Sequence, residues 1–180
     1  MRVITGKARG VQLKTPDSMT TRPTADRVKE ALFSIIQFEI PTASVLDLFG
    51  GTGQLGIEAL SRGAKSAVFV DAGEPACRLI KENLRRTKME NDAKVVRADY
   101  MDYLKRCREK FDIIFLDPPY AEVFLENALK CIAEIDILQS GGIIVTERPV
   151  GKELSFELPG YSRSRDYKYS STVLTIFRKD

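Results

Sequence analysis

Residues 44–62, SVLDLFGGTGQLGIEALSR, decide the fold of this chain. Their pattern predicts a short buried strand, a turn rich in glycine, and a helix that starts directly after the turn. The segment Gly51-Thr52-Gly53-Gln54-Leu55-Gly56 also matches the nucleotide-binding pattern GxGxxG, in which glycine lets the backbone approach a ligand closely. One match of this kind is weak, so its meaning depends on what the rest of the chain adds.

The rest of the chain repeats the same unit. Further apolar runs predict strands at residues 66–71, 93–98, 111–117 and 142–147. Amphipathic stretches predict helices at residues 53–62, 74–88, 100–109 and 122–136. This alternation predicts an α/β, Rossmann-like fold with a mostly parallel sheet and helices on both faces. The last two strands, at residues 154–158 and 172–178, have no helix between them, so we expect them to form an antiparallel edge hairpin in a seven-stranded sheet.

The first 40 residues form a separate pattern. Val3-Ile4 and Val11-Leu13 flank a turn at residues 6–10, which predicts a small hairpin. Thr24 is a candidate cap for a helix that ends near Pro41. We expect a single domain over residues 1–180, in which residues 1–40 are an N-terminal extension of hairpin and helix.

Composition excludes several classes of protein. The chain has no apolar run near the roughly 20 residues of a membrane span, and its charged N-terminus lacks the apolar middle of a signal peptide, so we expect a cytoplasmic protein. Its three cysteines lie far apart, and we expect no metal site. It contains no histidine, which excludes Ser-His-Asp and Cys-His hydrolases and imidazole general bases.

Acidic residues follow four of the predicted parallel strands. Asp47 ends the first strand, Asp71 the second, Asp99-Tyr100 follows the third, and Asp117 follows the fourth. In an open parallel sheet, ligands bind outside the carboxyl ends of the strands, where the strand order reverses. We therefore expect these side chains to share one crevice.

The acids favour an adenosine cofactor with a positive charge. Asp71, about 20 residues after the glycine turn, can accept hydrogen bonds from both ribose hydroxyls. Asp47 can orient the positively charged methionine end of S-adenosylmethionine, and Asp99 with Tyr100 can hold the adenine amino group and edge. An anionic pyrophosphate would prefer fewer acids nearby.

The segment Asp117-Pro118-Pro119-Tyr120 constrains the chemistry most tightly. Proline has no N–H group, so this corner presents a carboxylate and bare carbonyl oxygens as hydrogen-bond acceptors. An exocyclic amine that donates to Asp117 and to the Pro118 carbonyl would expose its lone pair, while its ring stacks on Tyr120. The corner therefore suits work on the amino group of a nucleobase or of another flat amide.

Basic residues gather at the two ends of the chain. Residues 1–30 carry a net charge of +4 and residues 161–180 carry +3, which leaves −4 for the middle. Such a distribution is typical of a protein that holds a polyanion around an acidic site, although solvated termini explain the charge alone equally well. The candidate phosphate contacts are Arg9, Arg22 and Arg27, with Arg165 and Lys168 as weaker ones.

The motifs DLFGGTGQLGIEALSRGA, FVD, ADY and DPPY resemble those of class I S-adenosylmethionine-dependent methyltransferases. The segments RVITGKARGVQLKTP and TRPTADRVKEALFSII extend the likeness to the RsmD family and to nearly the whole chain. This resemblance implies transfer of a methyl group to the N2 amino group of a guanine in 16S ribosomal RNA, with the small ribosomal subunit or an assembly intermediate as partner. The cofactor contacts that it implies are Asp47, Phe49, Gly51, Gly53, Asp71, Asp99 and Tyr100.

Three other functions stay open at this point. An adenine-N6 methyltransferase acting on RNA or DNA could use the same corner, because DPPY binds an amine rather than a particular ring. An NAD-dependent oxidoreductase could use GTGQLG and Asp71, but the chain offers no YxxxK pair and no substrate domain. A non-catalytic rRNA-binding protein would have no need for both a cofactor crevice and an acceptor corner.

Overall fold

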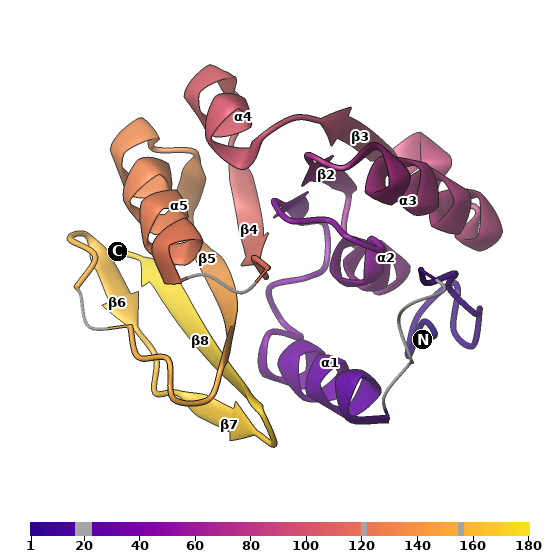
Figure 1. The fold of residues 1–180 in the computed structure, drawn as a ribbon, viewed down its shortest axis with the longest axis horizontal. Coiled ribbons are helices and arrows are strands. Elements are labelled where there is room, and N and C mark those ends of the chain that lie inside the picture. The colour runs from indigo at the N-terminus through magenta and orange to yellow at the C-terminus, as the bar shows by residue number, and fades with distance from the viewer. Residues whose placement is uncertain (17–22, 120–121, 155–156) are drawn as a thin grey trace.

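The computed structural model describes residues 1–16, 23–119, 122–154 and 157–180, apart from the side chains of 23–25 and 122 (Figure 1). The strands are β1 Ser44–Asp47, β2 Ser66–Asp71, β3 Ala93–Arg97, β4 Phe111–Leu116, β5 Leu138–Pro149, β6 Tyr161–Arg163, β7 Tyr167–Tyr169 and β8 Thr172–Lys179. The helices are α1 Pro23–Ile35, α2 Gln54–Ser61, α3 Glu74–Thr87, α4 Tyr100–Arg106 and α5 Glu122–Ile135, with a 3₁₀ turn at Glu90–Asp92. None of the described helices is long and apolar enough to cross a bilayer.

One mixed sheet organises the described residues, in the order β3-β2-β1-β4-β5-β8-β6, with β7 also paired to β8. Strands β1 to β5 are parallel, and β8 is antiparallel to β5. The chain runs outward from β1 through β2 to β3, then returns to place β4 on the other side of β1. The strand order therefore reverses between β1 and β4, which confirms the predicted α/β fold and sets the location of a ligand crevice.

The edge of the sheet differs from the prediction. Strand β8 pairs with β5 on one side, and its other neighbours are the short strands β6 and β7. The described part of 154–158 is not a strand, so the predicted hairpin partner is wrong, and the sheet has eight strands in the described residues rather than seven. Leu154 and Leu158 are instead buried in the apolar layer beside α5, which explains the apolar pattern of that segment.

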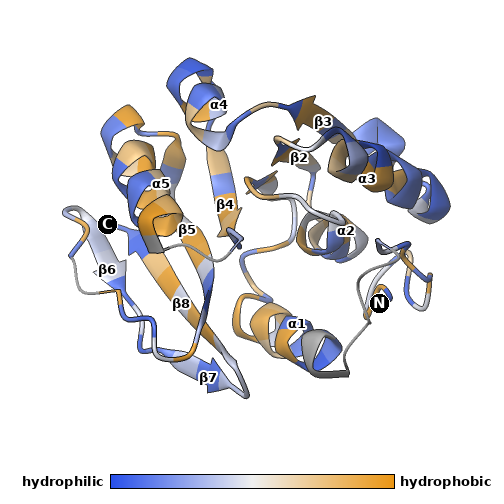
Figure 2. Cartoon of the chain, in the orientation of Figure 1, coloured by the Kyte–Doolittle hydropathy of each residue, from blue (hydrophilic) through white to orange (hydrophobic). Residues whose placement is uncertain are grey.

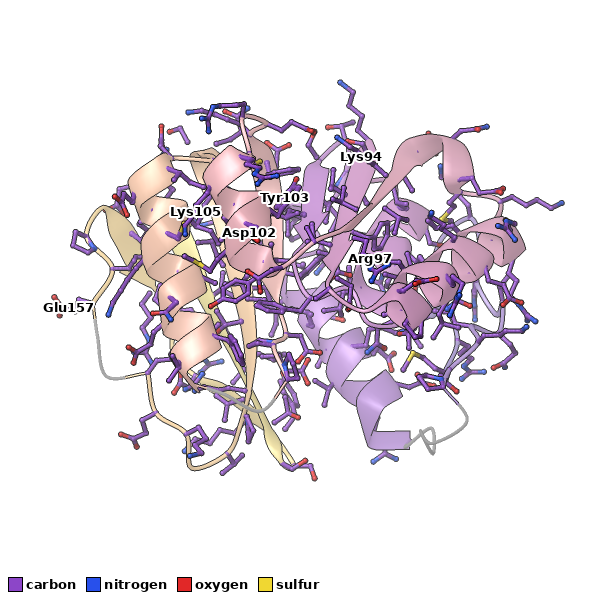
Figure 3. The ribbon with its side chains drawn as sticks, turned by 45° about the horizontal axis from the view of Figure 1, so that its top comes forward. Lys94, Arg97, Asp102, Tyr103, Lys105 and Glu157 are labelled. Carbon is purple, nitrogen blue, oxygen red and sulfur yellow. The ribbon has the colours of Figure 1, made fainter. Side chains whose placement is uncertain are left out.

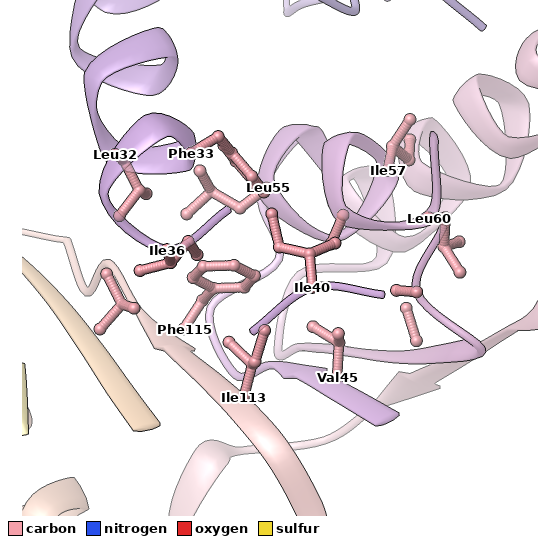
Figure 4. Close-up of a cluster of buried hydrophobic side chains, with 14 of the residues drawn as sticks. Leu32, Phe33, Ile36, Ile40, Val45, Leu55, Ile57, Leu60, Ile113 and Phe115 are labelled. Atoms are coloured by element: carbon pink, nitrogen blue, oxygen red, sulfur yellow. The ribbon is translucent and has the colours of Figure 1, made fainter. Parts of the chain in front are cut away.

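Two apolar layers cover the two faces of the sheet. Helices α1, α2 and α3 pack on one face and helices α4 and α5 on the other, and the buried side chains form one cluster on each side. Figure 2 shows apolar residues concentrated in β4, β5 and β8, while α3 is mostly hydrophilic on its outer side. In Figure 4, Phe115 of β4 lies under Phe33 of α1 and under Ile36, which directly follows that helix, and the Phe33 and Phe115 ring centroids are 5.8 Å apart. Helix α1 is therefore part of the core rather than an appendage.

A buried acid ties the N-terminal extension to α2. The Glu58 carboxylate is fully buried and accepts the backbone N–H groups of Ile4 and Thr5, at 2.8 and 3.0 Å. It also pairs with Arg62 and with Lys29 of α1, whose ammonium donates to the carbonyl of Arg2. Burial lowers the pKa of Lys29, and Glu58 opposes that shift. The single carboxylate thus fixes the hairpin, α1 and α2 relative to one another.

The predicted N-terminal hairpin is present and docks through its turn. Arg2 and Gln12 form an antiparallel bridge. Ser61 accepts the Lys7 N–H through its carbonyl oxygen at 2.8 Å and the Ala8 N–H through its hydroxyl at 3.0 Å. Gly6 lies directly on Ser61, because a Cβ atom at this position would be 1.8 Å from the Ser61 carbonyl oxygen.

Replacing Gly6 with alanine should detach the hairpin from α2. The substitution combines a positive φ of 88° with a clash against backbone, so we expect a loss of about 3 kcal/mol or more in the free energy of unfolding. Gly10 is the matched control, because its φ is 85° but no atom lies within 4 Å of the added Cβ, and its replacement should cost only about 1 kcal/mol. Urea denaturation measures both values, and equal losses would show that docking on Ser61 contributes nothing.

Candidate active site

The register of the sheet brings the predicted acids to one edge and one face. Asp47 is paired with Phe69 of β2 and with Phe115 of β4. Asp71 and Asp117 follow those two phenylalanines by two residues, and side chains two apart on a strand share a face. The acids therefore meet at the carboxyl ends of β1, β2 and β4, on the side covered by α1, α2 and α3. The charges of Asp71 and Asp117 both contribute to the raised pKa of Asp47, which is independent support for their proximity.

Asp47 is the innermost of these acids. Its side chain is 2% exposed, and its carboxylate accepts the N–H of Gly56 in the first turn of α2 at 3.1 Å. Burial is the main cause that raises its pKa to about 7; the charges of Asp117 and Asp71 contribute to the rise, and the Gly56 hydrogen bond opposes it. A buried carboxyl group without a cation strongly favours a positively charged ligand beside it.

Replacing Asp47 with asparagine should stabilise the ligand-free protein at high pH. The pKa of this acid is higher in the folded protein than its ordinary value of 3.8, so folding loses stability as pH rises from about 4 to about 7. Asparagine keeps an acceptor for Gly56 but does not ionise. Relative to wild type, the variant should gain roughly 2 kcal/mol between about pH 5 and about pH 8, measured by urea denaturation. A stability difference that is the same at both pH values would contradict the raised pKa.

Asp71 also holds the glycine turn, a role that the sequence did not predict. One carboxylate oxygen accepts the N–H of Gly51 at 2.9 Å, and the other accepts the N–H of Gly73 at 2.8 Å. Gly51 and Gly53 have positive φ values of 55° and 79°, which explains why glycine stands at both positions. Each carboxylate oxygen has a second lone pair, so Asp71 can still accept ribose hydroxyls.

The two predicted adenine contacts, Asp99 and Tyr100, differ in their surroundings: Asp99 already accepts backbone hydrogen bonds, and Tyr100 is packed between aromatic rings. Asp99 caps α4 by accepting the N–H groups of Met101 and Asp102, at 2.9 and 3.3 Å. Tyr100 is buried and lies between Phe49 and Phe124, with ring centroids 5.1 and 5.6 Å away. Phe49 and Tyr100 can thus form an apolar wall, whereas Asp99 keeps only part of its acceptor capacity. Phe124, which is 39% exposed, also belongs to this wall. The sequence interpretation did not include it, because it lies on α5 and not at the end of a strand.

The acceptor corner is described only in part. Asp117 and Pro118 directly follow β4 and are half-buried, and burial raises the pKa of Asp117. Tyr120 lies outside the described residues, so its predicted stacking role stays a prediction. The described residues contain no group of three metal-ligating side chains around these acids.

Two further polar residues at this edge escaped the sequence interpretation. Asn83 of α3 is fully buried, donates to the carbonyl oxygens of Thr52 and Lys14, and accepts the Lys14 N–H. It therefore links the glycine turn to the N-terminal segment. Glu147 of β5 lies beside Asp117 and has a raised pKa. Its position at the end of the apolar run Ile143-Ile144-Val145 is a signal that resembles the ends of the other parallel strands.

The candidate phosphate contacts are partly visible. Arg9 and Arg27 are exposed, and Arg22 lies outside the described residues. Arg165 stacks over Tyr167 at 5.1 Å beside the sheet edge, and Lys168 is exposed on β7. Arg97 reaches the start of α3, where it pairs with Glu74 at 3.1 Å (Figure 3). The Arg97 guanidinium therefore already has a carboxylate partner.

The fold and its acidic edge define the class of protein: this is the fold of class I S-adenosylmethionine-dependent methyltransferases. An Escherichia coli protein, YhhF, provisionally described as a methyltransferase, superposes with a TM-score of 0.90 at 30% identity, covering 100% of this chain and 98% of its own. The chain belongs to the family described as Conserved hypothetical protein 95, whose model matches residues 1–178. That is the RsmD family, so the resemblance seen in the sequence is confirmed.

Two relatives carry names that concern RNA. A Haemophilus influenzae protein named ribosomal RNA small subunit methyltransferase D is 36% identical over 157 residues, which are 86% of this chain and 81% of that protein. The Bacillus subtilis protein YlbH, provisionally described as an rRNA methyltransferase, is 38% identical over 99% of both chains.

Proposed function

We propose that this protein transfers a methyl group from S-adenosylmethionine to the N2 amino group of a guanine in 16S ribosomal RNA. The observation that carries the proposal is the convergence of Asp47, Asp71 and Asp117 at the carboxyl edge where the strand order reverses. The names of the relatives in the RsmD family support ribosomal RNA as the substrate.

The residues at this edge fit the cofactor. Asp47 is buried, and no cation of the described residues contributes to its pKa, which suits the ammonium and sulfonium charges. A Cβ atom at Gly51 would meet only one atom within 4 Å, the Phe49 carbonyl oxygen at 3.9 Å, so the turn leaves room for a ligand. Asp71 would hold the ribose hydroxyls, and Phe49 and Tyr100 would line the adenine.

The chemistry then requires little beyond positioning. When bound, S-adenosylmethionine supplies an activated methyl group and its own leaving group. Asp117 and the Pro118 carbonyl would accept the two N–H groups of the guanine amine and hold its lone pair in line with the methyl carbon. The same oxygens would stabilise the positive charge that develops on nitrogen. Asp117 can finally take the proton, and its raised pKa suits that step.

RNA would be held by the N-terminal extension. Glu58 and Ser61 fix the N-terminal hairpin and α1 on α2, so Arg9 and Arg27 would be presented on a rigid surface rather than on a mobile arm. Phosphate contacts of this kind position an RNA but do not select its sequence. The small ribosomal subunit or an assembly intermediate is the expected partner.

The test is methyl transfer with tritiated S-adenosylmethionine to ribosomal RNA, small ribosomal subunits and DNA in parallel. Ribosomal RNA or small subunits from a strain that lacks this gene are the samples that should accept label. Nucleoside analysis should then show N2-methylguanosine. Label in adenine, in RNA or DNA, would support the alternative of an adenine-N6 methyltransferase and overturn the proposal.

Equilibrium binding separates the remaining alternatives. S-adenosylmethionine should bind and NADH should not, because the acids at this edge repel a pyrophosphate. NADH binding without S-adenosylmethionine binding would support an oxidoreductase. RNA binding with no affinity for either cofactor would support a non-catalytic binding protein.

A further inference from the structure

Glu147 occupies the strand position next to Asp117. Strand β5 is parallel to β4, and Leu116 is paired with Thr146, so Asp117 and Glu147 are the next residues on the two strands. Glu147 is also paired with Leu174 of β8, which belongs to the apolar cluster under α1. Its side chain therefore lies on the same face of the sheet as Asp47 and Asp117, one strand further from the cofactor edge.

The environment of Glu147 is unusual for a structural carboxylate. Burial is the main cause of its raised pKa, and the charge of Asp117 raises it further. The Thr172 hydroxyl is its hydrogen-bond partner in the described residues, and no described cation contributes to its pKa. Two adjacent carboxyl groups that repel each other are stabilised by a ligand that offers hydrogen-bond donors to both.

Guanine has an edge of that kind. Its N2 amino group and its N1–H are neighbouring donors on one side of the ring, whereas adenine has an acceptor at N1 beside its amino group. The guanine amine lies between N1–H and the acceptor N3, and in the orientation that brings N1 to the β5 side the N1–H points toward Glu147. Donation from the N1–H of guanine favours the ionised form of Glu147, and that carboxylate repels the lone pair of an adenine N1.

We propose that Glu147 is the residue that selects guanine, by accepting its N1–H beside the amine held at Asp117. This inference rests on the proposed function and adds the origin of its base specificity. Asp117 and the Pro118 carbonyl recognise an amine, and Glu147 recognises the atom next to it. The two acids together present a pair of acceptors to a pair of donors, as a carboxylate does to a guanidinium.

The test uses 2-aminopurine, which keeps the 2-amino group but has an acceptor at N1. The RNA or particle that accepts methyl groups in the assay above is rebuilt with guanine, 2-aminopurine or adenine at the modified position. For wild type, kcat/KM should be about tenfold or more higher for guanine than for 2-aminopurine. In Glu147→Gln, whose amide can donate to N1, that ratio should fall about tenfold or more.

A second variant and two controls complete the design. Glu147→Ala should lower kcat/KM for guanine about tenfold and leave 2-aminopurine unchanged, because only guanine loses a partner. S-adenosylmethionine affinity should stay near wild type and thermal stability should be no lower than wild type in both variants, which excludes a folding defect. Glu157→Gln removes an exposed acid at the outer side of the molecule and should leave the base ratio unchanged (Figure 3).

The outcomes separate the two proposals. If wild type methylates guanine but Glu147→Gln has the same guanine to 2-aminopurine ratio, the role of Glu147 is refuted and the proposed function stands. If wild type methylates no guanine in any sample, the proposed function fails, and the inference about Glu147 fails with it.

Discussion

Replacing Asp117 with alanine should abolish methyl transfer while the protein still binds its cofactor. The carboxylate is the acceptor for the amine and the stabiliser of the charge that forms on nitrogen, and removing one such group costs about 10²–10³-fold in kcat. Asp117 directly follows β4, on the side of Asp47 away from Asp71, so the dissociation constant for S-adenosylmethionine should change by only about threefold. The assays are single-turnover methyl transfer and calorimetric titration of the cofactor.

Stability measurements show whether Asp117→Ala loses activity simply because it unfolds. Burial raises the pKa of Asp117, so the alanine variant loses an unfavourable buried charge and should unfold no more easily than wild type near neutral pH. Asp102→Ala, which removes an exposed acid from the first turn of α4, is the matched control and should keep full activity. An Asp117→Ala protein that binds cofactor weakly but turns over normally once saturated would mean that the two sites are misassigned.

The opposite phenotype is expected for Asp71→Ala. This variant loses the acceptor for the ribose hydroxyls. It also loses the two hydrogen bonds from the Gly51 and Gly73 N–H groups to Asp71 that hold the glycine turn in place in the wild type. Hydrogen bonds to a charged acceptor contribute about 1.5–3 kcal/mol each, so we expect cofactor affinity to fall by about 10²-fold or more. Single-turnover rates at saturating cofactor should fall much less.

Asp92→Ala provides the control for this second prediction. Asp92 is an exposed acid just before β3, at the amino edge of the sheet, and its loss should not change cofactor affinity. Asp71→Asn refines the result, because its single carbonyl oxygen can hold one of the two glycine N–H groups. Unchanged cofactor affinity in Asp71→Ala would show that Asp71 does not bind the ribose hydroxyls.

The sequence predicted the fold because its strands and helices alternate regularly. It also predicted that Asp47, Asp71 and Asp117 meet, since the carboxyl ends of parallel strands lie at one edge whatever the order of the strands. The N-terminal hairpin followed from its turn residues. These are local patterns or general rules of parallel sheets.

The parts that the sequence did not predict depend on which elements become neighbours. Glu147 lies next to Asp117 because β5 is paired with β4 in a register that places Leu116 opposite Thr146. The burial of Tyr100 follows from the packing of α4 against α5. The prediction of an edge strand at residues 154–158 is wrong because Leu154 and Leu158 pack in the core instead. Glu58, an acid in a helix, gave no sign that it would hold the backbone of residues 4 and 5.

A crystal structure with S-adenosylhomocysteine tests the central claim most directly. The ribose hydroxyls should lie within hydrogen-bond distance of the Asp71 carboxylate, the amino group near Asp47, and the sulfur atom should face Asp117. A nucleoside bound elsewhere, for example in the hollow between Glu39, Thr42 and Asp112 at the opposite edge of the sheet, would contradict the account.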